Sequence, residues 1–174
     1  AHIRWHSDIP KATHTGILQI AGLEIHCDVL ENGKRMIRQK EFLNAMGKGK
    51  IGGADAERAE LANLPVFLTA DNLKPYLEHE FWRGAISRIY RTKDNRRVTG
   101  YEAEVLPKAC KVYVEADDDG NVLKENQKKV AIVCRAMIYG LAEVGIISLI
   151  DDATGYVYER ERNELQKVLE AYIE

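Results

Sequence analysis

The spacing of hydrophobic residues is that of strands near the start of the chain and that of helices near its end. Apolar and polar residues alternate over residues 16–37, and strict alternation is typical of half-buried strands. Turns are expected at residues 21–22 (Ala-Gly) and at residues 32–33 (Asn-Gly), where Asn-Gly favours a two-residue hairpin turn. We therefore predict a β-meander, followed by a short helix over residues 38–47 that Gly47 ends.

The middle of the chain predicts a second hairpin. The sequence AISRIYRTKDNRRVTGYEAEV alternates on both sides of a polar centre, so the tip should lie at residues 93–96. Before it, the glycine-rich residues 48–65 predict a flexible connection leading into a short helix. Thr69 is placed to cap a further helix, which Pro75 should interrupt.

A helical period dominates the remaining residues. We expect Pro107 to open a helix through Ala116, and the longest helix to cover residues 123–144 and to end at Gly145. The DDATG motif, residues 151–155, predicts a turn before the final helix. The predicted fold class is therefore α+β, with an N-terminal meander and helix, a second hairpin, and a helical C-terminal half packed on the sheet.

The chain length of 174 residues fits one domain. We expect residues 1–14, which lack periodicity, to form an arm, and residues 15–156 to form a single α+β domain. Residues 157–174 should form a C-terminal helix that leads into a further region.

Composition and charge narrow the classes of protein. Apolar residues make up 45% and charged residues 30%, and the formal net charge is −2. These values are typical of a folded domain and exclude a globally basic nucleic-acid binder, although a local basic patch is compatible with them. No apolar run suggests a membrane span, so we expect no membrane contact and a cytoplasmic protein.

The sequence does not predict a metal site, a cofactor or a catalytic residue. Cys27, Cys110 and Cys134 are widely separated and lie in apolar segments, so they should be buried free thiols in a reducing compartment. Glu102 and Glu104 could share one strand face, as in a metal-dependent hydrolase. However, no lysine follows at short spacing to complete such a centre. Arg88 on the facing strand could instead form a cross-strand ion pair with these glutamates.

Basic residues cluster at the tip of the second hairpin. The sequence RTKDNRR contains Arg91, Lys93, Arg96 and Arg97, with Arg88 just before it and only Asp94 opposing them. One interpretation is a β-ribbon that touches a nucleic-acid backbone. The other is a solvated tip that charge keeps soluble, and charge runs are often of that kind.

The DDATGY motif also allows two interpretations. Thr154, Gly155, Tyr156 and Arg160 could form a recognition corner at the N-terminus of the last helix, where free amides favour a phosphate. We favour simple capping and packing, because two adjacent aspartates would repel a phosphate.

The final helix carries an apolar stripe up to the last residues of the sequence. An apolar helical face must be buried against a partner. We expect that partner to be a second copy of the chain or a further C-terminal region, which makes this an interaction helix. The residues of the stripe are Leu165, Val168, Leu169, Tyr172 and Ile173.

Several phrases, in this order, resemble a family of phage and plasmid proteins that carry a downstream p-sixty-three-C domain. They are IPKATHTGILQIAGLEIHCDVLENGKRMI, LTADNLKPYL, GYEAEVLPKACKVYVEA and LAEVGIISLIDDATGYVYERERNELQKVLEAYI. The opening that ends in FLNAMG is more loosely similar to Bro-type and antirepressor-type phage regulators. The resemblance implies that the polypeptide continues past the last helix.

Together these patterns favour a non-enzymatic regulatory protein that binds nucleic acid through the basic hairpin. The alternative is a protein-interaction or oligomerisation module without nucleic-acid contact. A metal-dependent hydrolase is the weaker alternative.

Overall fold

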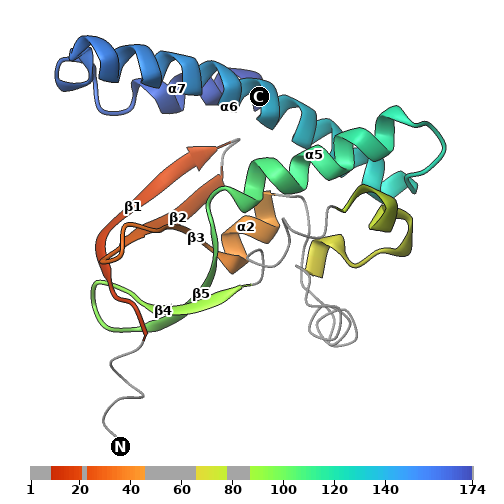
Figure 1. The fold of residues 1–174 in the computed structure, drawn as a ribbon, viewed down its shortest axis with the longest axis horizontal. Helices are drawn as coiled ribbons and strands as arrows, with labels where there is room; N and C mark the ends of the chain where they lie inside the picture. Colours follow the sequence, from red (N-terminus) through yellow and green to blue (C-terminus); the bar gives the residue numbers. More distant parts are fainter. Residues whose placement is uncertain (1–8, 21–22, 46–65, 78–86, 174) are drawn as a thin grey trace, which may run out of the picture.

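The computed structural model describes residues 9–20, 23–45, 66–77 and 87–173. Helices and strands in this part of the chain form one sheet with helices packed on it (Figure 1). The α+β prediction is therefore confirmed. The predicted turn at residues 21–22, the helix end at Gly47 and the connection over residues 48–65 lie outside the described residues.

Within the described residues, five strands form an antiparallel sheet in the order β1-β2-β3-β5-β4. The predicted meander supplies the first three strands. The second hairpin extends the same sheet, because β5 pairs with β3 and brings Ile37 opposite Tyr101. The strands are β1 (Ala12–Ile20), β2 (Leu23–Leu30), β3 (Arg35–Arg38), β4 (Arg88–Arg91) and β5 (Arg97–Glu102).

The two outer strands of the sheet meet at one end. Lys11, just before β1, forms a parallel bridge with Arg91 at the end of β4, and the Arg91 amide donates a 2.9 Å hydrogen bond to the Pro10 carbonyl. The sheet therefore curls until its edges touch. The predicted arm over residues 1–14 is wrong for residues 11–14, because Lys11 bridges β4 and residues 12–14 lie in β1; residues 1–8 lie outside the described part.

Both hairpin turns that the structure describes use three residues. In the first, the Gly33 amide donates to the Leu30 carbonyl at 2.8 Å, and Gly33 alone has a positive φ, of 84°. In the second, the Asn95 amide donates to the Thr92 carbonyl at 3.0 Å, and Asn95 has φ of 68°. The predicted two-residue turn at Asn32-Gly33 is therefore wrong, because a turn whose last residue is left-handed also suits the sheet twist.

The shorter helices differ from the prediction at their ends. Helix α2 (Gln39–Ala45) follows β3 directly, and α5 (Val105–Asp118) begins two residues before Pro107. Pro107 fits there because amides in the first turn have no partner within the helix. Two 3-10 helices, η1 (Val66–Leu68) and η2 (Asp71–Tyr76), precede the hairpin. Ala70 precedes η2 without a side-chain cap, so Thr69 is not the capping residue.

The longest helix, α6, runs from Glu125 to Thr154 and ends at Gly155, which has φ of 81°. The prediction that it ends at Gly145 is wrong. A glycine inside a helix costs only about 1 kcal/mol, and α6 continues past it while packing against the last helix, α7 (Glu164–Ile173). The short 3-10 helix η3 (Tyr156–Tyr158) joins them.

By length and composition alone, α6 could cross a membrane. Its most apolar window of 18 residues has a mean hydropathy of 1.9, and 28% of that window is buried within the fold. The expectation that no apolar segment reaches spanning length is therefore wrong. The core helix of a folded domain passes the same test.

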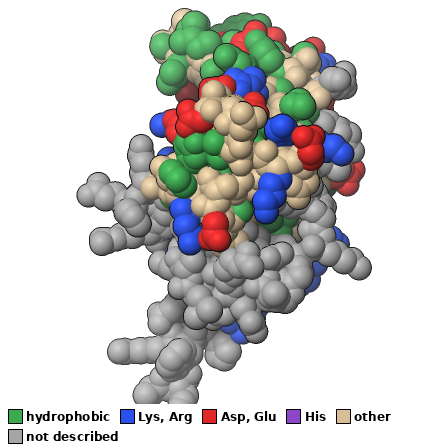
Figure 2. Space-filling model, turned by 90° about the vertical axis from the view of Figure 1, so that its right-hand side faces the viewer, with side chains coloured by type: hydrophobic (Ala, Val, Ile, Leu, Met, Phe, Trp, Pro, Cys, Tyr) green, Lys and Arg blue, Asp and Glu red, His purple; other side chains and the backbone are tan. Residues whose placement is uncertain are grey.

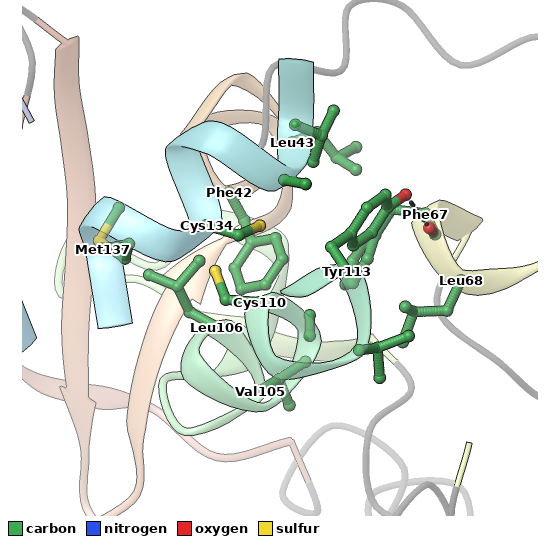
Figure 3. Close-up of a cluster of buried hydrophobic side chains, with 14 of the residues drawn as sticks. Phe42, Leu43, Phe67, Leu68, Val105, Leu106, Cys110, Tyr113, Cys134 and Met137 are labelled. Carbon is green, nitrogen blue, oxygen red and sulfur yellow. Dashed lines mark hydrogen bonds between the residues drawn. The ribbon is translucent and has the colours of Figure 1, made fainter. Parts of the chain in front are cut away.

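The main core lies between one face of the sheet and the helices α2, α5 and α6. Phe42 has its ring centroid 5.0 Å from those of both Phe67 and Tyr101, and the Tyr113 hydroxyl donates a 2.7 Å hydrogen bond to the Phe67 carbonyl (Figure 3). A second, smaller core fills the concave face of the curled sheet. It consists of Ala12, Leu30, Met36 and Tyr90, with Val98 packed against it.

Candidate functional site: the basic hairpin

The basic hairpin consists of β4, β5 and the turn between them. Its register places Arg91 directly opposite Arg97, and Tyr90 opposite Val98. Tyr90 and Val98 point into the smaller core. Successive side chains of a strand alternate between faces, so Arg91 and Arg97 point to the other face.

Lys11 extends this pair into a row of three cations. It bridges Arg91 on the side away from Arg97, and its neighbour Ala12 is buried in the smaller core. Lys11 therefore shares the outward face with the two arginines. We call Lys11, Arg91 and Arg97 the basic row.

Among the described residues, no carboxylate oxygen lies within 4.0 Å of a side-chain nitrogen of the basic row. Glu31 is close, but its carboxylate accepts from the backbone amide of Lys11, at 3.3 Å. Like charges directly opposite on neighbouring strands destabilise a sheet. An anion bound across the row would relieve that repulsion.

Part of the charge at the tip of the hairpin is neutralised within the tip, because Asp94 pairs with Arg96. Thr92 is buried, and its hydroxyl donates a hydrogen bond to the Asp94 carboxylate. The Thr92 hydroxyl oxygen also accepts a 3.0 Å hydrogen bond from the backbone amide of Arg96. Arg96 Nε donates to Asp94 Oδ2 at 3.0 Å. The pKa of Asp94 is lowered chiefly by the Thr92 hydroxyl, so this carboxylate stays charged beside Arg96. Lys93 is exposed.

The five basic residues predicted from the sequence are therefore not one cluster. Arg91 and Arg97 lie side by side, and Lys93 is near them at the turn. Arg96 is instead paired with Asp94. Arg88 lies opposite Gly100 on the face that Tyr90 shares, away from the basic row. No local pattern pointed to Lys11, because its contact with Arg91 joins residues 80 positions apart.

A buried polar group beneath the hairpin holds β4 in place. Tyr90 Oη donates to Asp28 Oδ2 at 2.6 Å, and Arg38 donates to the two Asp28 oxygens at 3.1 and 3.4 Å. Burial alone would raise the pKa of Asp28, but hydrogen bonds from Arg38, Tyr90 and Thr15 lower it below its ordinary value. Burial, and then the bond to Asp28, raises the pKa of Tyr90. In this cluster of Asp28, Arg38 and Tyr90, the Asp28 carboxylate is therefore charged and the Tyr90 phenol is neutral.

Gly100 makes room for this arrangement. A Cβ atom at Gly100 would lie 2.7 Å from the Ile37 carbonyl oxygen and 3.0 Å from Tyr90 Cε1. Only glycine allows β3 and the Tyr90 ring to approach β5 this closely. The position of the Tyr90 ring thus depends on a residue in the partner strand.

The predicted recognition corner lies at the C-terminus of α6, whereas it was expected at the N-terminus of the last helix. Thr154 is the last residue of α6, and its hydroxyl donates to the Ile150 carbonyl at 2.8 Å. The last helix begins only at Glu164. A helix C-terminus repels phosphate, and Arg160 is already paired with Asp151 at 2.8 Å. Thr154, Gly155, Tyr156 and Arg160 therefore do not lie at the N-terminus of the last helix, where the phosphate site was expected.

The apolar stripe of the last helix is partly covered within the same chain. Leu169 is buried in the main core, Leu165 and Val168 are half-buried, and Tyr172 is 43% exposed. Leu169 and Tyr172 pack directly over Gly140 of α6. Helix α6 and strand β1 therefore supply a partner surface for part of the stripe within this chain. Contact of the stripe with a second copy or a further region stays a prediction.

The described residues do not gather carboxylates for metal chemistry. Glu102 ends β5 and pairs with Lys34 at 3.0 Å rather than with Arg88, while Glu104 precedes α5. Within the described ranges no three His, Cys, Asp or Glu side chains form a group that could hold a metal ion. A cavity of about 420 Å³ between the sheet and the helices is lined mainly by apolar side chains, so it offers little chemistry.

The cysteines differ in exposure. Cys110 and Cys134 are buried, as expected, and they lie near one another between α5 and α6 (Figure 3). Cys27 is only partly buried. The contact with Cys110, and then burial, raises the pKa of Cys134. Burial also raises the pKa of Cys27. A raised pKa favours the protonated thiol at Cys27 and Cys134 over the thiolate, which is the reactive form.

No protein-family model matches this chain, no curated protein matches it in sequence, and no solved structure matches its fold. The assignment of a function therefore depends on the geometry of the basic hairpin.

Proposed function

We propose that this protein binds nucleic acid through the basic row, with Lys93 as an additional contact, and acts as a non-enzymatic regulator of the phage or plasmid type. The basic row is the observation that carries the proposal. Three cations lie next to one another on one face of the sheet without an acidic partner among the described residues.

The dimensions of the row suit a phosphate backbone. Neighbouring strands lie about 4.8 Å apart, so side chains on three adjacent strands span about 10 Å. A nucleic-acid strand in a duplex carries one phosphate per 3.4 Å of helix axis, and the row therefore spans about three phosphates. Two of the three cations are arginines, which bind phosphate oxygens with two parallel hydrogen bonds.

The basic row is suited to positioning the protein on a nucleic-acid backbone rather than to recognising a base sequence. Phosphate contacts fix register and orientation, whereas base edges carry sequence information. Arg96, at the tip, is the arginine best placed to probe a groove, but its Nε is bound to Asp94. We therefore expect weak, salt-dependent binding to duplex and single strands alike.

The test compares two double charge reversals. Lys11→Glu with Arg97→Glu changes the row, and Lys40→Glu with Lys129→Glu makes the same change of net charge at exposed positions on α2 and α6. Binding to labelled duplex and single strands of about 20 nucleotides is followed by fluorescence anisotropy. We expect the first variant to lose binding and the second to retain it, with a slope of log affinity against log salt of about −3 for three phosphate contacts.

Equal loss of binding in both variants would show that only net charge matters. Absence of binding by the unmodified protein at low salt would contradict the proposal. Circular dichroism of both variants shows whether the fold is retained.

A protein-interaction module is the rival function, and one observation favours it. The outward face of α6 carries large exposed apolar side chains, Ile132, Tyr139, Ile146, Leu149 and Ile150. An interaction through this face would not involve the hairpin, so the rival function predicts that charge reversal in the basic row leaves the interaction unchanged.

A further inference from the structure

The outward face of α6 is apolar along much of its length. Ile132 is 71% exposed, Tyr139 61% and Ile146 54%. Figure 2 shows hydrophobic side chains gathered at the top of the molecule, where α6 and α7 lie in Figure 1, above a surface on which acidic and basic side chains are mixed. Contiguous exposed apolar surface of this kind commonly marks an interaction site.

The exposed residues form a stripe centred on Tyr139. At 100° per residue, seven residues between positions 132 and 146 lie within about 60° of the direction in which Tyr139 points. The face directly opposite contains Cys134, Met137 and Leu141, which pack in the main core. We call the seven residues the α6 stripe: Ile132, Arg135, Ala136, Tyr139, Ala142, Glu143 and Ile146.

The α6 stripe reads the same in both directions from Tyr139, with the charge reversed. Alanines lie three residues away on each side, isoleucines lie seven residues away, and the positions four residues away are Arg135 and Glu143. A two-fold interface requires self-complementary patterns of this kind, because the same patch of surface is used by both subunits.

We propose that the α6 stripe binds a second copy of this chain, with the two α6 helices antiparallel and the two-fold axis at Tyr139. Seven residues correspond to about 10.5 Å along a helix. The antiparallel arrangement therefore brings Ile132 of each copy level with Ile146 of the other. Ala136 and Ala142 allow close approach of the helices beside the tyrosines.

The same arrangement pairs opposite charges. Arg135 of each copy comes level with Glu143 of the other, whereas any parallel alignment in register places like charges together. Arg135 also binds Asp118 at 2.7 Å within its own chain, and Glu143 accepts the Tyr172 hydroxyl. Both side chains remain accessible, since Arg135 is 39% exposed and Glu143 is exposed. Their intrachain contacts hold them at the edges of the stripe.

A lipid surface is a less suitable partner for this face. The opposite side of α6 is packed against α5 and α7, and the helix carries the buried Asp151, which is paired with Arg160. Helices that lie on membranes usually flank their apolar face with lysine and arginine. Here acidic and basic residues alternate after the C-terminal end of the exposed face, at Glu159, Arg160, Glu161 and Arg162, and do not form a basic flank.

Single cysteines locate the two-fold axis. Tyr139→Cys should form a disulfide-linked dimer under mild oxidation, because position 139 of one copy faces position 139 of the other. Ile132→Cys is the matched control, since the new thiols of the two copies lie about 21 Å apart along the helices. A mixture of Ile132→Cys and Ile146→Cys should cross-link only between the two different chains. The unmodified chain, with its three native cysteines, gives the background.

Charge reversal tests the pairing without a cross-link. Arg135→Glu and Glu143→Arg each make both charge pairs repulsive, and each should raise the dissociation constant of the dimer by at least about tenfold. An equimolar mixture restores both pairs and should form a heterodimer with affinity near that of the unmodified protein. Sedimentation equilibrium measures all three.

A protein that stays monomeric at all accessible concentrations would overturn the proposal. So would a dimer that cross-links equally well through position 132, or a mixture of the charge variants that fails to associate. Binding to anionic phospholipid vesicles that Ile132→Glu abolishes, with a monomer in solution, would assign the face to a membrane instead. Circular dichroism verifies that the Arg135→Glu variant, which loses its bonds to α5, is folded.

Discussion

Tyr90 donates a 2.6 Å hydrogen bond to Asp28 across 62 positions of sequence, from the hairpin to the centre of the meander. Both side chains are almost completely buried, and Arg38 provides the opposite charge. This bond connects the strand that carries Arg91 to the rest of the sheet.

Replacing Tyr90 by phenylalanine should therefore loosen the hairpin. The substitution removes a hydrogen bond to a charged group, and we expect the free energy of unfolding to fall by about 1.5–3 kcal/mol. Tyr158→Phe, at a tyrosine that is 90% exposed, is the control and should change little. Urea denaturation measures both, and equal stability of the two variants would mean that the buried bond contributes nothing.

Asp28 should make stability depend on acid pH. Its pKa is lowered in the folded protein, so its contribution is present above the unfolded pKa of about 3.9 and is lost as pH falls through the folded value. Asp28→Asn should cost about 3 kcal/mol at pH 7, because it leaves Arg38 partly buried without a counter-charge. The difference from the unmodified protein should shrink below about pH 4.

Asp71→Asn is the control for this pH dependence, because the ion pair of Asp71 with Lys74 is exposed and such pairs contribute little. A difference between the unmodified protein and Asp28→Asn that stays constant down to about pH 2 would contradict the lowered pKa.

A methyl group at Gly100 should be poorly tolerated. It would lie 2.7 Å from a backbone oxygen of β3, which cannot move aside as a side chain can, and overpacking of this kind costs about 1–3 kcal/mol. Gly16→Ala is the matched control in β1, where no heavy atom lies within 4 Å of the added carbon. We expect Gly16→Ala to be neutral or to stabilise by up to about 0.5 kcal/mol, and thermal denaturation would separate the two.

The last helix should contribute to the stability of the monomer. Leu169 lies in the main core against Gly140, so Leu169→Ala should lower the free energy of unfolding by about 2–5 kcal/mol. Leu149→Ala makes the same change at an exposed position and should cost little. If Leu169→Ala alters the oligomeric state but leaves the stability of the isolated chain unchanged, the helix is an interaction element after all.

Local patterns predicted the elements well and their contacts poorly. The alternation on both sides of RTKDNRR identified β4 and β5, since strand periodicity is a local property. Glu102 was expected to pair with Arg88, but β5 pairs with β3 as well as with β4, and this brings Glu102 to Lys34. Strand order is set by long-range packing, which local spacing does not report.

The errors along α6 and α7 have a common physical cause. Gly145 was expected to end the helix and the DDATG motif to form a turn, but a glycine inside a helix costs only about 1 kcal/mol, and α6 packs against α7, where Leu169 is buried over Gly140. The same packing covers Leu169 and leaves Tyr139 exposed. The periodicity of each helix was correct, but it could not show which of the two apolar surfaces would be covered.

The bridge between Lys11 and Arg91 also bears on self-templated aggregation. Unpaired strand edges are templates on which other chains add strands, and a curled sheet that joins its own edges leaves less of that template open. The Pro10 carbonyl accepts a hydrogen bond from the backbone amide of Arg91, and the charged residue Lys11 lies beside this bond. Pro10 and Lys11 thus connect the two edges of the sheet. A chain trimmed to begin after Lys11 would expose the ends of β1 and β4 together to strand addition.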